Sequence, residues 1–187
     1  MTNHFLIIIG LFYFSNQTFS QSTGITSFIP AGYAILDSAS GDLNKDRLKD
    51  YVLILKVDEE EEHADTTRPL LLLMGTVRDQ YQLLARNDSV VLCKSCGGVF
   101  GDPYAGITIK NNFFSVEHYG GSNWRWTRII TFRYDAKTKQ FLLHRDAGES
   151  FHTSDPDKMK LNLHEKEDFG KLPFAKYSYD KAWRELP

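Results

Sequence analysis

Short stretches of apolar or alternating residues, separated by turn residues, recur along most of the chain. This spacing is typical of an all-β domain. The turns include the pair Asn111 and Asn112, which favours a tight hairpin, and a longer polar turn over residues 135–139. We therefore predict a predominantly antiparallel all-β fold with little helix, either a sandwich, a partial barrel or a propeller-like meander. The predicted strands cover residues 33–37, 51–57, 69–75, 81–86, 106–110, 113–119, 124–134, 140–145 and 159–164.

Two kinds of strand pattern are present. Residues 51–57 and 70–74 are apolar at nearly every position, which predicts central strands that are covered on both faces. Residues 124–134 instead alternate, and one face of that strand is predicted to point into the core. This core face consists of Trp124, Trp126, Arg128, Ile130, Phe132 and Tyr134.

The N-terminus begins with an apolar run of ten residues, 5–14, followed by a polar stretch. A membrane-spanning helix needs about 20 apolar residues, so this run fits the core of a signal peptide better. Small residues at Thr18 and Ser20 place the expected cleavage near Ser20. We predict a signal peptide over residues 1–20 and a single β-rich domain over 21–187, secreted or periplasmic. The alternative is a buried N-terminal strand.

Charge and hydropathy exclude several classes of partner. The formal net charge is −2, and 25% of residues are charged. A chain of this composition lacks the basic field that nucleic-acid binding requires, so no nucleic-acid partner is expected. Beyond the predicted signal peptide no apolar run approaches membrane-spanning length, so we expect no transmembrane segment in the mature form.

A run of oxygen-bearing side chains precedes the apolar strand at 51–57. Asp42, Asn44, Asp46 and Asp50 occupy positions 1, 3, 5 and 9 of a tight loop, and the Leu48 carbonyl occupies position 7. Oxygens at this spacing converge on one point, which is how proteins hold calcium. We predict calcium as the cofactor. The alternative is a turn without metal, stabilised by hydrogen bonds from Asx side chains to the backbone.

The loop resembles the Asp-x-Asp-x-Asp-Gly-x-x-Asp calcium loops of FG-GAP and VCBS-type β repeats, which also occur in dockerin-like modules. The resemblance covers residues 40–54 and implies calcium ligation by the five loop residues just named. Two residues depart from the pattern, because Asn44 replaces an Asp and Arg47 stands where the family has Gly. Arg47 would have to adopt a left-handed or similarly tight conformation, which costs a residue with a Cβ roughly 1 kcal/mol or more. No second copy of the loop is present, so the resemblance does not imply a complete propeller.

Cys93 and Cys96 are the two cysteines, and the chain is expected to leave the reducing cytosol. A local disulfide is the leading prediction. The glycine-rich segment 97–103 follows, which disfavours the helix that a thioredoxin-like redox pair would need. Zinc would need two further ligands at suitable spacing. A redox pair, zinc ligation and a reduced pair therefore stay as alternatives.

The acidic run at residues 58–65 lies between two strong predicted strands. Like charges repel, so we predict an extended and solvated hairpin loop there. A weak patch for a cation or a basic partner is the functional alternative.

Polar residues that could support acid–base chemistry gather in the second half of the chain. The candidates are Glu117, His118, Arg125 and Glu149. They match no nucleophile, metallohydrolase or phosphate-loop motif, so we favour a structural reading in which Glu117 and Arg125 form a cross-strand ion pair.

Aromatic residues make up 13% of the chain, and several lie beside Gly120 and Gly121. Aromatic side chains next to such turns form binding platforms for sugars or partner proteins. Tyr119, Trp124 and Trp126 are the candidate binding residues. A binding role is therefore preferred over an enzymatic one.

The longer segment 91–157 is similar to a set of uncharacterised exported bacterial proteins, through its Cys-Lys-Ser-Cys-Gly-Gly and Gly-Gly-Ser-Asn-Trp-Arg-Trp motifs. The resemblance implies an envelope location and no particular activity. The leading hypothesis is an extracytoplasmic, calcium-stabilised β module that binds a protein or glycan partner. The alternatives are an envelope hydrolase centred on Glu117 and His118, and a purely structural envelope protein.

Overall fold

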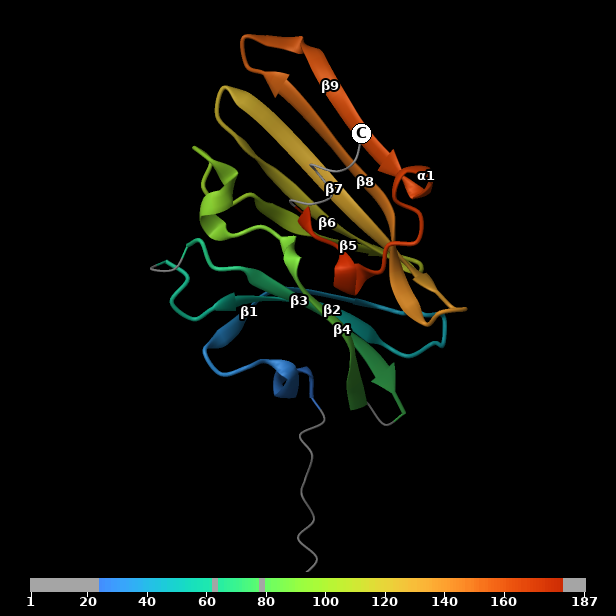
Figure 1. Ribbon diagram of the computed structural model, residues 1–187. Coiled ribbons are helices and arrows are strands. Elements are labelled where there is room, and N and C mark those ends of the chain that lie inside the picture. Colours follow the sequence, from blue (N-terminus) through green and yellow to red (C-terminus); the bar gives the residue numbers. More distant parts are fainter. Residues whose placement is uncertain (1–23, 62–63, 78–79, 180–187) are drawn as a thin grey trace, which may run out of the picture.

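Two antiparallel sheets make up the protein in the computed structural model, which describes residues 24–61, 64–77 and 80–179 (Figure 1). The four-stranded sheet contains β1 (Tyr33–Gly41), β2 (Asp50–Val57), β3 (Arg68–Thr76) and β4 (Gln80–Val91) in that order. The five-stranded sheet contains β5 (Tyr104–Lys110), β6 (Phe113–Gly121), β7 (Trp124–Asp135), β8 (Gln140–His152) and β9 (Asp155–Glu165). The predicted antiparallel all-β fold is confirmed. The predicted signal peptide and its cleavage point lie outside the described residues.

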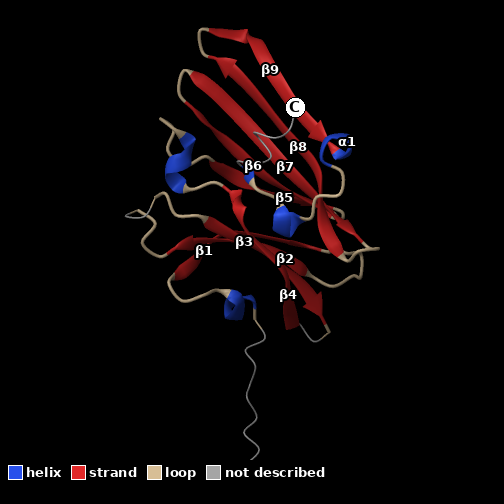
Figure 2. Cartoon of the chain, viewed as in Figure 1, coloured by secondary structure: helices blue, strands red, loops and turns tan. Residues whose placement is uncertain are grey.

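Helix is scarce, as predicted (Figure 2). Each element is a turn or so long: α1 (Lys166–Phe169) and the 3₁₀ turns η1 (Ile25–Phe28), η2 (Lys94–Gly97) and η3 (Phe174–Lys176). No helix in the described part of the chain is long and apolar enough to cross a membrane.

The main core lies between the two sheets. Leu70 and Leu72 of β3 face Phe114 of β6 and Phe132 of β7, and all four are fully buried. The Phe114 and Phe132 rings stack with centroids 5.2 Å apart, and Phe174 of η3 contacts both rings from the side. The prediction of the β7 core face holds for Ile130 and Phe132.

The outer face of the four-stranded sheet is also buried. Leu53, Leu55, Leu71 and Leu73 form a second apolar cluster there. Ile25, Phe28 and Ile29, from the segment that precedes β1, pack against this cluster. Figure 1 shows this segment beneath the four-stranded sheet, away from the five-stranded one. The prediction that residues 51–57 and 70–74 are covered on both faces is therefore confirmed.

The loop between β2 and β3 corrects one prediction. Glu60 is buried and accepts a hydrogen bond from Arg68 Nε at 2.6 Å, so the acidic run is not wholly solvated. Arg68 is fully buried and also donates two hydrogen bonds of 2.7 Å to the carboxylate of Asp102. The buried guanidinium needs carboxylate partners, and this demand outweighs the repulsion within the acidic run.

Candidate functional site

The predicted calcium loop directs its side-chain oxygens inward, onto its own backbone. Asp42 Oδ1 and Asn44 Oδ1 both accept from the backbone N–H of Asp46, at 3.1 and 2.9 Å. Asp42 Oδ2 accepts from Arg47 N–H at 3.0 Å, and Asp46 Oδ1 accepts from Leu48 N–H at 2.8 Å. The oxygens of Asp42 and Asn44 therefore lie on the same side of the loop, within reach of one donor.

Asp50 has a different role in this loop. It is fully buried, and its two oxygens accept from the backbone N–H groups of Leu43 at 2.7 Å and Gly75 at 2.9 Å. Burial raises the pKa of this carboxyl, while the two backbone donors oppose that shift. Asp50 thus ties the loop to β3, and Leu43 anchors it in the core.

The loop backbone bears out one prediction drawn from the family pattern. Arg47, at the position where the calcium loops have Gly, has a φ of 70°, and Lys45 has a φ of 67°. Both are in the left-handed region, which residues with a Cβ adopt at a cost.

The donor set fits calcium in part. Asp42, Asn44 and Asp46 offer the hard oxygen ligands that calcium prefers. Both oxygens of Asp50, however, already accept backbone hydrogen bonds. Within the described residues, no three Asp, Glu, His or Cys side chains lie close enough to hold a metal ion together. Calcium therefore stays a prediction, with Asp50 as support for the loop.

The two cysteines form a disulfide, as predicted, with Cα atoms 5.2 Å apart. It closes the η2 turn at the start of a loop that leads to β5. The loop also bonds to the β6–β7 hairpin, because Val99 N–H donates to the Gly121 carbonyl at 3.2 Å. Further along, Asp102 holds the loop to the buried Arg68.

Glycines allow the loop and the hairpin to approach each other closely. A Cβ on Gly120 would lie 2.6 Å from the Trp126 ring and 2.9 Å from the Gly97 carbonyl oxygen. Gly121 has a φ of 114°, which favours glycine. The Gly-Gly pair is therefore needed for packing at this end of the sheet.

This rigid base presents exposed apolar side chains. Val99 is 82% exposed, Phe100 46%, Tyr119 39% and Trp124 55%, and we call these four residues the end patch. The rings of Phe100 and Tyr119 lie 5.5 Å apart. The prediction that Trp124 faces the core is wrong, because β7 begins at Trp124, next to the hairpin turn, where the residue is 55% exposed and its ring contacts His152 at the end of β8.

The candidate binding residues thus divide. Tyr119 and Trp124 belong to the end patch, whereas Trp126 is partly buried and packs against Gly120. Val99 and Phe100 were missed, because an apolar pair in a glycine-rich loop does not follow strand or helix periodicity.

Arg125 packs against one member of the end patch, Phe100. Its guanidinium lies over the Phe100 ring, 3.6 Å from the centroid. Its Nη1 atom is shielded from solvent and has no hydrogen-bond partner in the described chain. The expected ion pair with Glu117 does not form, because the register pairs Arg125 with Gly121 and Glu117 with Ile129.

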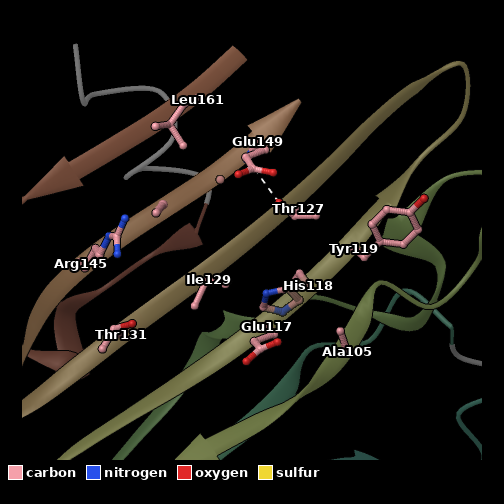
Figure 3. Close-up of a pocket in the computed structure, with 12 residues that line it drawn as sticks. Ala105, Glu117, His118, Tyr119, Thr127, Ile129, Thr131, Arg145, Glu149 and Leu161 are labelled. Carbon is pink, nitrogen blue, oxygen red and sulfur yellow. Dashed lines mark hydrogen bonds between the residues drawn. The ribbon is translucent and has the colours of Figure 1, made fainter. Parts of the chain in front are cut away.

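A shallow depression of about 350 Å³ lies on the outer face of the five-stranded sheet (Figure 3). Glu117 of β6 and Glu149 of β8 both line it, on either side of β7. Tyr119 lines it as well, so the depression continues into the end patch. Arg125 is not among its lining residues.

His118 lies beside Glu117 in sequence, but its imidazole is buried inside the sandwich. Leu92 N–H donates to Nε2 at 3.3 Å, and Nδ1 has no hydrogen-bond partner in the described chain. Burial, together with the smaller effect of the nearby cations Arg128 and Arg68, lowers the pKa of His118 to about 4. His118 is among the residues that line the depression, but it is only 2% exposed, so its imidazole is not available to a ligand beside the two carboxylates.

Comparison with family models, curated proteins and solved structures finds no match to this chain. The similarity to calcium loops and to exported bacterial proteins therefore stays a prediction.

A buried polar cluster close to His118 was missed by the sequence analysis. Arg128 is fully buried and donates to both carboxylate oxygens of Asp146, at 2.7 and 2.5 Å. The Tyr177 hydroxyl donates to the same carboxylate at 2.8 Å, and the Tyr179 ring lies 3.9 Å from the guanidinium. Burial raises the pKa of Tyr177, so the phenol stays protonated. The signal was a charged Arg128 on the predicted core face of β7, which calls for a buried carboxylate partner.

Proposed function

We propose that this protein is an extracytoplasmic β-sandwich module that binds a partner protein through the end patch, with the 42–50 loop as a calcium-dependent stabiliser. The observation that carries the proposal is the exposure of Val99 and Phe100 on a loop that is otherwise held firmly. The expected export of the chain supports the extracytoplasmic location.

The loop that carries the end patch is fixed at several points. The disulfide closes its beginning, Asp102 binds the buried Arg68, and Gly98 pairs with Gly121 at the β6–β7 hairpin. Apolar side chains held in water gain nothing from the hydrophobic effect until a partner covers them. A rigid surface also loses little conformational entropy on binding, which favours affinity. Exposed aromatic anchors on a rigid base are typical of the centre of a protein interface.

The composition of the patch favours a protein over a glycan. Val99 is aliphatic and is the most exposed member, so it suits an apolar side chain better than sugar hydroxyls. Arg125, beneath Phe100, forms no ion pair in the described chain. A carboxylate on the partner would be attracted by this positive charge. The expected partner segment therefore combines a large apolar side chain with a neighbouring Asp or Glu.

Calcium is proposed as a stabiliser of the loop between β1 and β2. Asp42, Asn44 and Asp46 would hold the ion, together with the Leu48 carbonyl, and Asp50 would keep its backbone partners. A bound cation would replace the repulsion between the neighbouring carboxylates with attraction, and its binding free energy would add to the stability of the fold.

Hydrolysis is the second candidate, because Glu117 and Glu149 line one depression. Binding is preferred, since the His118 imidazole lies inside the sandwich, away from that face. A purely structural role would leave the exposure of the end patch without a purpose.

A peptide-display selection on the purified protein tests the proposal. Enriched peptides are expected to pair a large apolar residue with Asp or Glu, and to lose at least about tenfold in affinity for the Val99→Ser/Phe100→Ser variant. The matched control is Val77→Ser/Leu83→Ser, which removes two exposed apolar side chains, one in the turn after β3 and one on β4. Equal loss in both variants, or binding of glycans instead of peptides on an array, would overturn the proposal.

A further inference from the structure

The depression on the outer face of the five-stranded sheet has a defined layout of side chains. The strand register places Ile129 of β7 between Glu117 of β6 and Ala147 of β8. On β8, Arg145 lies two residues before Ala147 and Glu149 lies two residues after it, so these two side chains mark opposite ends of the depression. Figure 3 shows these two side chains on β8, with Glu117 on the far side of β7.

The floor of the depression is apolar at its centre. Ile129 is 43% exposed and Leu161 of β9 is 62% exposed, and both line the depression. Thr127 and Thr131 flank Ile129 along β7 and provide hydroxyl groups. An apolar group of a ligand would cover the exposed isoleucine and leucine.

The three charged groups around this floor have no ionic partners within the described chain. Glu117 accepts one hydrogen bond, from the Thr108 hydroxyl at 3.3 Å. The Glu149 carboxylate and the Arg145 guanidinium make no hydrogen bond or salt bridge to any described residue. Among the residues that the structure describes, the site therefore offers two carboxylates and one guanidinium without ionic partners around an apolar centre.

We propose that this depression binds a short peptide with free termini. The peptide ammonium group would lie between Glu117 and Glu149, the terminal carboxylate would pair with Arg145, and an apolar side chain would rest on Ile129 and Leu161. Such a ligand meets all three charges at once. A neutral sugar would leave all three charged groups unpaired. A ligand with a single charge would pair either with the carboxylates or with the guanidinium, but not with both.

The dimensions agree with this ligand class. Arg145 and Glu149 are four residues apart on β8, which corresponds to about 13 Å along the strand. Side chains that lean toward the centre shorten that span. A peptide of two or three residues extends about 7–10 Å, so it would reach from the carboxylates to the guanidinium.

Matched peptides test the charge assignment directly. Isothermal titration with Leu-Leu-Leu, its N-acetylated form and its C-terminal amide would compare ligands that differ by one charge. The free peptide is expected to bind at least about tenfold more tightly than either capped form. Equal affinity for all three would show an apolar contact only, and no binding at millimolar concentration would exclude the peptide site.

Variants assign each end of the ligand to its residue. Glu117→Gln/Glu149→Gln should bind the free and the N-acetylated peptide equally, while still discriminating against the amide. Arg145→Gln should show the reverse preference. The control Glu167→Gln, on α1, should keep both preferences, as should the end-patch variant Val99→Ser/Phe100→Ser. If Glu117→Gln/Glu149→Gln still bound the N-acetylated peptide more weakly, or Arg145→Gln still bound the amide more weakly, the proposed orientation of the peptide would be wrong. This outcome does not depend on what the end patch binds.

Discussion

The two sheets of the sandwich differ most in their outer faces. On the four-stranded sheet, residues 25–29 cover a continuous row of leucines, and that face is part of the core. On the five-stranded sheet, Ile129 and Leu161 stand exposed among threonines and charged residues. Side chains alternate between the two faces of a strand in both sheets, so the difference lies in which residues point outward and in what the chain supplies to cover them. A face left open with unpaired charges is available to a ligand.

The largest expected effect is the difference in the free energy of unfolding between a charge removed from the inner face of the five-stranded sheet and one removed from its outer face. Asp146→Asn would leave the buried Arg128 without its anionic partner, at a cost of about 3–5 kcal/mol in the free energy of unfolding. Glu149→Asn, on the same strand but on the open face, should change stability by less than about 0.5 kcal/mol. Urea unfolding of both variants measures the difference. Similar costs would show that the outer-face charges are structural.

The next effect compares the covered and the open outer face. Leu73→Ala removes a fully buried side chain beneath the N-terminal segment, and should lower the free energy of unfolding by about 2–5 kcal/mol. Ile129→Ala removes a partly exposed side chain, and should cost less than about 1 kcal/mol. Thermal unfolding followed by circular dichroism is sufficient, since the two variants differ enough to resolve. A large loss from Ile129→Ala would mean that its face is covered in solution.

The sequence predicted the covered face better than the open one. A short apolar run such as Leu70 to Met74, with turn residues on either side, favours a strand that is buried on both faces, so burial followed from composition. The second half of β8 was missed, because residues 146–150 are small or charged and follow no apolar alternation. Asp146 is instead buried by its long-range partner Arg128, and only the folded register shows that pairing.

The candidate sites also divide into those that sequence could predict and those that it could not. The disulfide and the left-handed Arg47 were predictable, since each depends on residues close in sequence. The end patch and the depression depend on which strands become neighbours, and on Phe100 meeting Tyr119 and Arg125 across two loops. Local spacing carries no such information.

A pH titration distinguishes a buried from an exposed ionisable group. The folded-state pKa of His118 is about 4, below the value of about 6.5 expected in the unfolded chain. The unfolded state therefore binds the proton more readily between these values, so stability falls as pH drops from about 6.5 to about 4, and the total loss approaches about 3 kcal/mol.

His118→Gln provides the control for this titration, because a glutamine oxygen still accepts from Leu92 N–H and does not titrate. The variant should lose less stability than the parent over the same pH range, as measured by urea unfolding at several pH values. If the free energy of unfolding fell equally with pH in the parent and in His118→Gln, then His118 would bind its proton as readily in the folded state as in the unfolded state, and the proposed pKa shift would be wrong.

The smallest expected effect concerns the 42–50 loop, where oxygens of Asp42 and Asn44 meet at the Asp46 amide. Calcium at a hundredfold excess over its dissociation constant should stabilise the fold by about 2.7 kcal/mol, because it binds the folded state alone. The melting temperature should therefore rise with calcium and fall with EDTA. Asp42→Asn/Asp46→Asn should abolish the response, whereas Asp135→Asn/Asp155→Asn, which removes two carboxylates from other turns, should preserve it. A melting temperature that changes with neither calcium nor EDTA would make the loop a set of Asx turns, in which Asp42 and Asn44 only accept hydrogen bonds from the Asp46 and Arg47 amides.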